Sequence, residues 1–290
     1  HLNYRPNNIA RALKVKSSSN IVFIADQITN EHFSQIINEL DIAAYDKGYI
    51  VSICANRNTR EFVSHIISRQ FDGIVISSIS FPEEYIQYFI DAKIPVVLLK
   101  NRNYKEIKGI GMIDTGLYKG AKECVQHLVD RGRKNILYLD RASSRGNFST
   151  DTDFRLKGFK EQMKKNGISI SEKNIITGCE NEDQVIDKIK RRILEGFNAD
   201  GIFARNDRLA CMGMTAVKSL GLKIPEDIAI IGFDNSSLSK YTTPTLTTME
   251  MQRREIGRSA IEMLYQMIEH GPEAALSKEF DTRLIIREST

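Results

Sequence analysis

The feature that most constrains the fold is a regular alternation of short apolar runs with amphipathic segments of helical period. Runs such as NIVFIAD (20–26) and IAIIGF (228–233) are apolar at successive positions, so both faces of each strand must be covered. The segments between such runs place apolar residues three or four positions apart, as in 30–47, which predicts helices. This alternation indicates parallel sheets with helices on both sides.

The expected elements form two similar blocks. The strands are expected at 20–26, 49–55, 72–78, 95–99, 110–113, 135–140, 174–177, 200–204, 228–233 and 279–287. The helices are expected at 30–47, 58–69, 82–92, a segment that ends at Gly132, 152–166, 182–195, 207–220 and 252–270. Because this series is too long for one compact sheet, it predicts an α/β fold of two doubly wound parallel-sheet lobes joined by crossover strands.

The lobe boundaries follow from letting the chain cross back near its end. We expect one lobe at 17–134 plus 249–277, so that helix 252–270 packs on it, and the other at 135–248 plus 278–290. Open α/β sheets bind ligands beyond the carboxyl ends of their strands. Two facing lobes therefore predict a cleft for a small ligand, with hinge closure around it.

Charge separates the first sixteen residues from the rest. The chain has 41 Lys and Arg against 37 Asp and Glu, a net charge of +4. Residues 1–16 hold four of these bases and no acid, so the remainder is neutral. A neutral body is a poor nucleic-acid surface, whereas a basic arm suits phosphates. On charge alone, a solvated basic tail remains an alternative.

Signals for membranes, secretion, metals and cofactors are missing from the sequence. No run approaches the ~20 apolar residues that span a bilayer, and the first residues lack the apolar core of a signal peptide. The four cysteines are scattered without metal spacing, which favours reduced thiols in a cytoplasmic protein. Phosphate-binding, dinucleotide, nucleophile-elbow and zinc-protease motifs are absent, so we expect no catalytic residues, metal or cofactor.

Polar side chains gather after five of the predicted strands instead. Amides, carboxylates and an arginine next to aromatic residues suit a polyhydroxyl or similarly polar ligand. Each residue alone is equally well explained as a helix cap, and Phe33 alone is better explained as core. The candidates so placed are Asn30, His32, Phe33, Lys100, Asn101, Arg155, Asn206 and Asp234.

Several segments resemble the lactose/galactose repressor (LacI/GalR) family over nearly the whole chain. The most specific are YRPNNIARAL (4–13), FDGIVI (71–76), ARNDRLACMG (204–213), LKIPEDIAIIGFD (222–234), TPTLTT (243–248) and REST (287–290). The resemblance implies a periplasmic-binding-protein-like fold, an effector-binding cleft, a homodimer and no enzymatic activity. It further implies a transcriptional regulator, in most cases a repressor, that controls operator DNA in response to a small sugar-like effector.

The first residues resemble the end of a DNA-binding headpiece and its hinge helix. The resemblance assigns 1–16 to a linker remnant, with Tyr4, Asn7, Arg11 and Leu13 facing DNA. In the family the hinge leucine, here Leu13, separates a base step in the minor groove. We expect most of the headpiece to be absent from this chain, which should then bind operator weakly or not at all.

Carried over residue by residue, the resemblance makes Asn30, His32, Phe33, Arg155, Asn206 and Asp234 effector contacts. Several positions depart from the family. Where the family usually has Asp-Arg, this chain has Lys100-Asn101, and where the family has an aromatic residue and a glutamine, it has Glu180 and Met251. His32 lies in the segment 30–33, where the family usually has Asn-Pro-Phe-Phe. Because these changes together replace aromatic stacking with charge, as at Glu180, an effector with an amino or acidic group gains support over a plain pentose or hexose.

Two other classes of protein are alternatives to a transcriptional regulator. A periplasmic-type solute-binding protein shares the fold but needs a signal peptide, and an enzyme in the cleft needs an activated group that the motifs do not supply. The sequence does not distinguish induction from corepression by the effector, or a dimer from a tetramer.

We expect Arg155→Ala to abolish effector binding and leave the fold intact. We also expect dimer contacts from helix 30–47 and from 207–220, with Leu209, Met212 and Met214.

Overall fold

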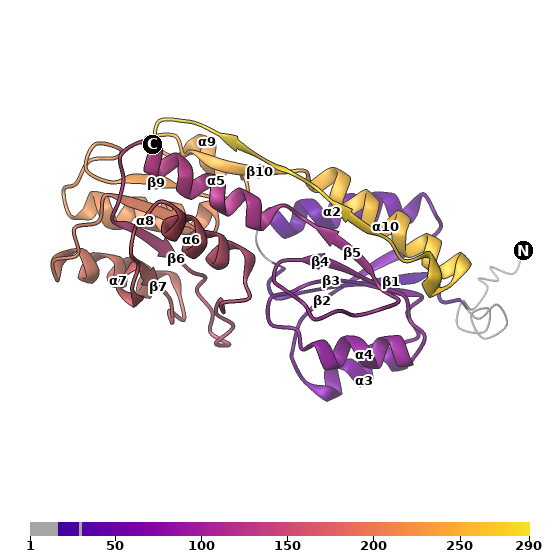
Figure 1. Cartoon of the computed structure of the whole chain (residues 1–290). Helices are drawn as coiled ribbons and strands as arrows, with labels where there is room; N and C mark the ends of the chain where they lie inside the picture. Colours follow the sequence, from indigo (N-terminus) through magenta and orange to yellow (C-terminus); the bar gives the residue numbers. More distant parts are fainter. Residues whose placement is uncertain (1–16, 29–30) are drawn as a thin grey trace, which may run out of the picture. The chain divides into compact units, whose positions relative to one another are not determined.

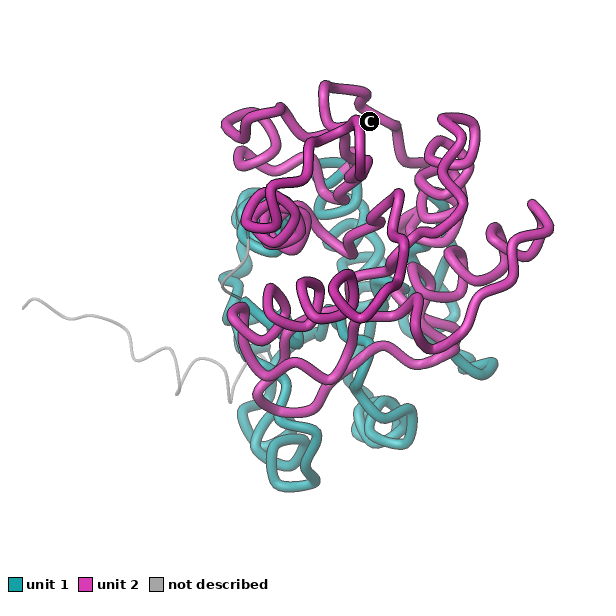
Figure 2. Tube along the Cα trace, turned by 90° about the vertical axis from the view of Figure 1, so that its left-hand side faces the viewer, with its two compact units in different colours: residues 1–100, 104–114, 253–280 teal, residues 101–103, 115–252, 281–290 magenta. Residues whose placement is uncertain are grey.

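The structure is a computed structural model that describes residues 17–28 and 31–290 and divides into two compact units (Figures 1 and 2). The first unit contains residues up to Lys100, Tyr104–Asp114 and Arg253–Phe280. The second contains Asn101–Asn103, Thr115–Gln252 and Asp281–Thr290. The chain therefore passes between the units several times, and each unit is assembled from separate stretches of sequence.

The first unit is built on a six-stranded parallel sheet in the order β11-β5-β4-β3-β1-β2. Its strands are β1 (Asn20–Ala25), β2 (Ile50–Ala55), β3 (Gly73–Ser77), β4 (Val96–Lys100), β5 (Gly111–Asp114) and β11 (Ser277–Glu279). Its helices are α2 (Glu31–Tyr45), α3 (Arg60–Ser68), α4 (Glu83–Asp91), α10 (Arg253–His270) and the short 3-10 helix η2 (Pro272–Ala274).

Helices cover both faces of this sheet, as its fully apolar strands require. α3 and α4 lie on one side, and α2 and α10 lie on the other (Figure 1). The α10 side packs very closely, because a Cβ added at Gly73 would lie 2.7 Å from the side chain of Leu264. α2 and α10 also pack closely against each other, since a Cβ added at Gly257 would lie 2.8 Å from that of Glu39. Glycine at both positions permits this contact.

The second unit combines a four-stranded parallel sheet, β7-β6-β8-β9, with the antiparallel pair β10–β12. Its strands are β6 (Ile136–Leu139), β7 (Ile175–Ile176), β8 (Gly201–Ala204), β9 (Ala229–Ile231), β10 (Thr248–Met251) and β12 (Thr282–Ile285). Its helices are α5 (Leu117–Asp130), α6 (Phe154–Lys165), the 3-10 helix η1 (Glu172–Asn174), α7 (Glu182–Leu194), α8 (Asp207–Ser219) and α9 (Leu238–Tyr241).

Alternate residues of the central strands form two separate cores in the second unit. Leu137, Leu139 and Ile202 pack in one cluster with residues of α7 and α8. The residues between them face the other way, and Tyr138 stacks on Phe159 of α6 with ring centroids 5.4 Å apart. Because successive strand side chains point to opposite faces, this alternation buries both sides of the sheet, as predicted from the sequence.

The predicted boundary between the lobes differs from the structure around α5. Residues 115–134 were expected in the first lobe, but α5 lies in the second unit, where it packs against α6 and β12. The strand predicted at 279–287 is two strands, since β11 joins β5 of the first unit and β12 pairs with β10 of the second. α10 lies in the first unit, and the linker assigned to 1–16 lies outside the described residues.

Among residues 17–28 and 31–290, no helix is both long and apolar enough to cross a bilayer.

Candidate functional site

Charged residues follow the carboxyl ends of the central strands in the second unit. Asp140 follows β6, Arg205 follows β8, and Asp234 lies three residues after β9. All three are buried. Because these strands are parallel neighbours, their carboxyl ends meet at one edge of the sheet, which is where α/β folds bind ligands. This edge is the best candidate for a site in the second unit.

Arg155 and Asp234 form a buried ion pair at this edge. Arg155 lies in the first turn of α6, and its Nη2 is 3.3 Å from Oδ1 of Asp234. The guanidinium also lies over the ring of Phe233, 4.6 Å from the centroid. Burial lowers the pKa of Arg155. Within the described part of the chain, its Nε is buried without a hydrogen-bond partner, a donor suited to a polar ligand.

Arg205 holds the loop that leads into α6. Its Nη1 is 2.7 Å from Oδ2 of Asp153 and donates to Oγ of Ser149 at 2.6 Å. Ser149 in turn donates its backbone N–H and its hydroxyl to Asp140, at 2.9 and 2.6 Å. The other oxygen of Asp153 caps α6 by accepting the N–H of Arg155 at 3.0 Å. One chain of contacts thus runs from the strand ends to Arg155.

Asp207 is the carboxylate of this edge whose pKa departs furthest from its ordinary value. It opens α8, and it is buried. Its carboxylate accepts the N–H and hydroxyl of Ser236 at 2.6 and 2.9 Å and the hydroxyl of Thr248 at 2.5 Å. Burial and the neighbouring carboxylate of Asp234 raise the pKa of Asp207 to about 7, despite these hydrogen bonds. Near neutral pH, therefore, a large fraction of Asp207 holds a proton.

Stability is expected to fall with rising pH because of Asp207. Its pKa is raised from 3.8 to about 7, so between these values the folded chain holds a proton that the unfolded chain releases. The stabilisation is fully present below pH 3.8 and is lost as the pH rises through about 7, on the order of a few kcal/mol in all. In urea unfolding from pH 5 to 8, Asp207→Asn should flatten the profile, because an amide does not titrate.

The control for this pH dependence is Asp227→Asn. Asp227 is exposed in the loop between α8 and β9, and its carboxylate likewise accepts a backbone N–H, from Lys223 at 2.7 Å. This variant should keep the wild-type pH profile. Identical profiles for wild type and Asp207→Asn would contradict the role given to Asp207.

The first unit has its own polar cluster at the carboxyl ends of β1, β2 and β3. Asp26 accepts the N–H of Ile79 at 2.9 Å, the hydroxyl of Ser80 at 2.8 Å and the hydroxyl of Ser78. Asn56 donates to the same carboxylate at 3.2 Å. These groups satisfy one another's hydrogen-bonding needs, which indicates a structural support for the loop after β3.

Four of the predicted site residues lie at this strand-end edge of the second unit, namely Arg155, Asp234, Asn101 and Asn206. The carbonyl of Asn101 accepts the N–H of Phe154, next to Arg155, at 3.0 Å. Asn206 is the N-cap of α8, and its side-chain oxygen accepts the N–H of Leu209 at 2.9 Å. Its side chain therefore caps the helix, which is the alternative role that its residue type also predicts. Glu180 is exposed, beyond β7 at the far edge of the sheet.

In the first unit, the predicted residues have mainly structural contacts. Phe33 is buried and packs against Phe23, with ring centroids 6.3 Å apart, so it belongs to the core. His32 contacts Phe33 edge to face, at 5.1 Å. Lys100 is paired with Asp114 at 3.8 Å, which offsets its charge. Asn30 and the predicted DNA contacts Tyr4, Asn7, Arg11 and Leu13 lie outside the described residues.

Sequence reasoning missed Asp26, Asp140, Asp153 and Arg205 as parts of these polar networks. A signal for three of them was present, because Asp26, Asp140 and Arg205 each directly follow an apolar strand. A charged residue at that position has to be paired or solvated, since its neighbours along the strand are buried.

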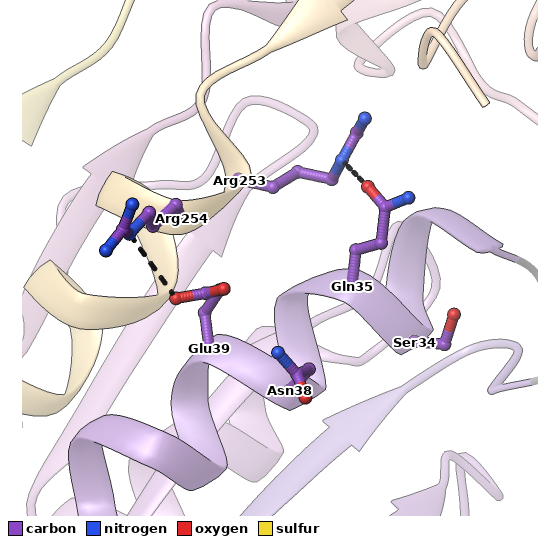
Figure 3. A pocket seen from close by; sticks show the side chains of 6 residues that line it. All are labelled: Ser34, Gln35, Asn38, Glu39, Arg253 and Arg254. Carbon is purple, nitrogen blue, oxygen red and sulfur yellow. Dashed lines mark hydrogen bonds and ion pairs between the residues drawn. The ribbon is translucent and has the colours of Figure 1, made fainter. Parts of the chain in front are cut away.

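A second polar feature of the first unit is a pocket between α2 and α10 (Figure 3). It is lined by Ser34, Gln35, Asn38, Glu39, Arg253 and Arg254. Arg253 donates to Gln35 at 2.6 Å, and Arg254 lies 4.0 Å from Glu39, so both arginines are engaged by the opposite helix. These contacts connect α2 to α10 and make the pocket part of the helix packing.

Metal binding receives no support from the described residues, which contain no group of three or more His, Cys, Asp or Glu placed to hold an ion.

The chain is similar to several known proteins. Residues 125–290 match the model of the periplasmic binding protein-like domain. The chain is 29% identical to the HTH-type transcriptional repressor PurR of Vibrio vulnificus, over 99% of this chain and 86% of that protein. It is also 29% identical to the ribose operon repressor of Halalkalibacterium halodurans, over 100% and 85%.

A solved structure of the lac repressor dimer bound to operator and an anti-inducer has a similar fold. The TM-score is 0.81 at 22% identity, and the match covers 99% of each chain.

Proposed function

Because the chain belongs to the family of periplasmic binding protein-like domains, in the branch formed by the lactose/galactose repressors, we propose that it is the effector-binding body of a transcriptional repressor. A small polar effector binds to it and controls the binding of operator DNA by the full-length protein. The function is regulatory rather than enzymatic, and it is exerted in the cytoplasm, where the operator lies.

The observation that carries this proposal is the Arg155–Asp234 pair at the strand ends of the second unit. A ligand that bears neighbouring hydroxyls donates to Asp234 and accepts from Arg155, which fits a sugar or a sugar derivative. The unpaired Nε of Arg155 adds one more donor for a ring or hydroxyl oxygen. The predicted cleft between the lobes and the DNA contacts of the hinge stay predictions.

The dimer is assigned to a surface of the first unit, which we call the α2–β2 surface. It consists of the exposed apolar residues Ile42 and Tyr45 on α2 and Ile50 and Ile53 on β2. α2 and β2 contact each other, and β2 is an edge strand of the sheet. An exposed edge strand with apolar neighbours can pair with another chain. An operator with two-fold symmetry is bound by a protein with the same symmetry, which a homodimer provides.

The proposed function is tested by a thermal-shift screen followed by calorimetry. The panel contains D-ribose, other pentoses, hexoses, sugar phosphates, amino sugars and purines. A true effector at a hundredfold excess over its dissociation constant stabilises the protein by about 2.7 kcal/mol, a rise of several degrees in Tm. The same compound should lose at least about tenfold in affinity for Asp234→Asn, which removes the charge at almost constant shape.

The matched control is Arg208→Ala. Arg208 is an exposed arginine on α8 that pairs with Glu182, so its loss should leave the affinity unchanged. A panel in which no compound raises the Tm of the wild type, or a hit whose affinity is equal for wild type and Asp234→Asn, would count against the proposed function.

A further inference from the structure

Asp234 is presented by a short segment with an unfavourable backbone conformation. Asp234 and the following Asn235 have φ angles of 111° and 47°, both in the left-handed region that favours glycine. Such conformations persist only where surrounding contacts determine them, and they cluster at functional sites. Something in the second unit must therefore hold residues 234–236 in this shape.

Asp207 makes the contacts that hold this segment. Although it is the first residue of α8, its side chain turns to the segment after β9. It accepts both the N–H and the hydroxyl of Ser236, two residues beyond Asp234. Its other oxygen accepts the hydroxyl of Thr248 on β10, and Thr248 Oγ1 accepts the N–H of Asn235 at 3.2 Å. Asp207 thus binds Ser236 directly and Asn235 through Thr248.

Backbone contacts and close packing leave Asp207 little freedom. Its own N–H donates to the carbonyl of Phe233 at 2.9 Å, which ties the start of α8 to the residue before Asp234. The N–H of Asp234 donates to Met249 of β10 at 2.8 Å. A Cβ at Gly232 would lie 2.4 Å from Oδ1 of Asp207, so only glycine permits this approach. The carboxylate is therefore enclosed by the segment that it supports.

We propose that Asp207 is a positioning residue that fixes Asp234 for effector binding through Ser236 and Thr248. The carboxylate of Asp234 is thereby held 3.3 Å from Arg155 by contacts within the chain, so ligand binding does not have to order the segment. The inference rests on the proposed function only in naming Asp234 as an effector contact. The fixation itself depends only on contacts within the chain.

The first test is amide hydrogen exchange on the ligand-free protein. Asp207→Ala and Thr248→Val should each speed exchange at residues 234–239 by about tenfold or more, because both remove support from this segment. Exchange in β6 and β8 should stay as in the wild type. Asp207→Asn should rescue the segment, since an amide still accepts from Ser236 and donates to the Thr248 hydroxyl.

The control for the exchange test is Asp227→Ala, which removes a carboxylate that also accepts a backbone N–H in the same unit. It should leave residues 234–239 unchanged. Wild-type exchange at 234–239 in Thr248→Val, or equal acceleration in β6, β8 and the segment, would overturn the proposal. If Asp207→Ala does not fold, the exchange rates of Thr248→Val alone decide whether the segment depends on these contacts.

The second test measures affinity for D-ribose by calorimetry. Asp207→Ala should weaken binding by about tenfold or more, whereas Asp207→Asn should keep near wild-type affinity. In the Asp234→Asn background, Asp207→Ala should cause little further loss, because it acts through Asp234. Additive losses would overturn the positioning role. A wild type that binds neither D-ribose nor other sugars counts against the proposed function, while the exchange test still decides the fixation.

Discussion

Replacing Arg155 with alanine is expected to lower the free energy of unfolding by about 3–5 kcal/mol, in addition to removing effector binding. Arg155 is only 7% exposed, and its partner Asp234 is 5% exposed. Loss of the guanidinium removes the positive charge that lies 3.3 Å from the buried carboxylate of Asp234. From the sequence alone the fold was expected to tolerate this change, but the burial of the pair alters that expectation. Urea unfolding of the single variant measures the effect.

Two further variants separate the lost pair from a general loss of packing. The double variant Arg155→Ala with Asp234→Ala removes both charges and should recover part of the lost stability, but it should not bind the effector. Arg208→Ala breaks the exposed pair with Glu182 and should change the free energy of unfolding by less than about 1 kcal/mol. Wild-type stability of Arg155→Ala would show that Asp234 does not depend on this counter-charge.

The strands and helices were predictable because their signals are local. β1, β3 and β8 are continuous apolar runs, and both faces of their sheets are covered. The end of the chain was less predictable, since β11 and β12 are exposed or half-buried and lack an apolar pattern. What defines them is pairing with β5 and β10, which depends on contacts far apart in sequence.

The site was predictable as an edge of a sheet, but not as a network. Arg155 and Asp234 are 79 positions apart, and only the fold brings them together. Asn206 and Asp207 are neighbours that both qualify as caps by residue type. The structure gives Asn206 the cap, while Asp207 binds Ser236 and Thr248. Which of two adjacent polar residues supports the site depends on the direction of each side chain, and this direction is set by tertiary packing.

One of the two predicted dimer segments was wrong. Leu209, Met212 and Met214 of α8 are buried within the second unit, in the cluster formed with α7 and the sheet. Their apolar spacing is therefore that of a helix face packed on the core. Because these side chains are already buried within the unit, they are not exposed for contact with a partner chain. The predicted helix 30–47, in contrast, carries Ile42 and Tyr45 on its exposed side.

Charges placed on the α2–β2 surface are expected to convert the dimer into a monomer. Tyr45 and Ile50 are 77% and 63% exposed, so a change to glutamate costs the isolated chain little. In a two-fold interface each patch faces its own copy, so both introduced charges lie near the equivalent charges of the partner. Sedimentation velocity should find wild type as a dimer at tens of micromolar, an order-of-magnitude concentration, and Tyr45→Glu with Ile50→Glu as a monomer.

The matched control places the same charge on an exposed apolar residue of the second unit. Leu194, at the end of α7, is 73% exposed, and Leu194→Glu should stay dimeric. The two monomerising substitutions lie in the first unit, whereas Arg155 and Asp234 belong to the second, so effector affinity measured by calorimetry should match the wild type. A wild type that is monomeric at this concentration, or a Tyr45→Glu, Ile50→Glu variant that remains dimeric, would move the interface elsewhere. An effector affinity that falls together with the dimer would instead show that effector binding depends on the second subunit.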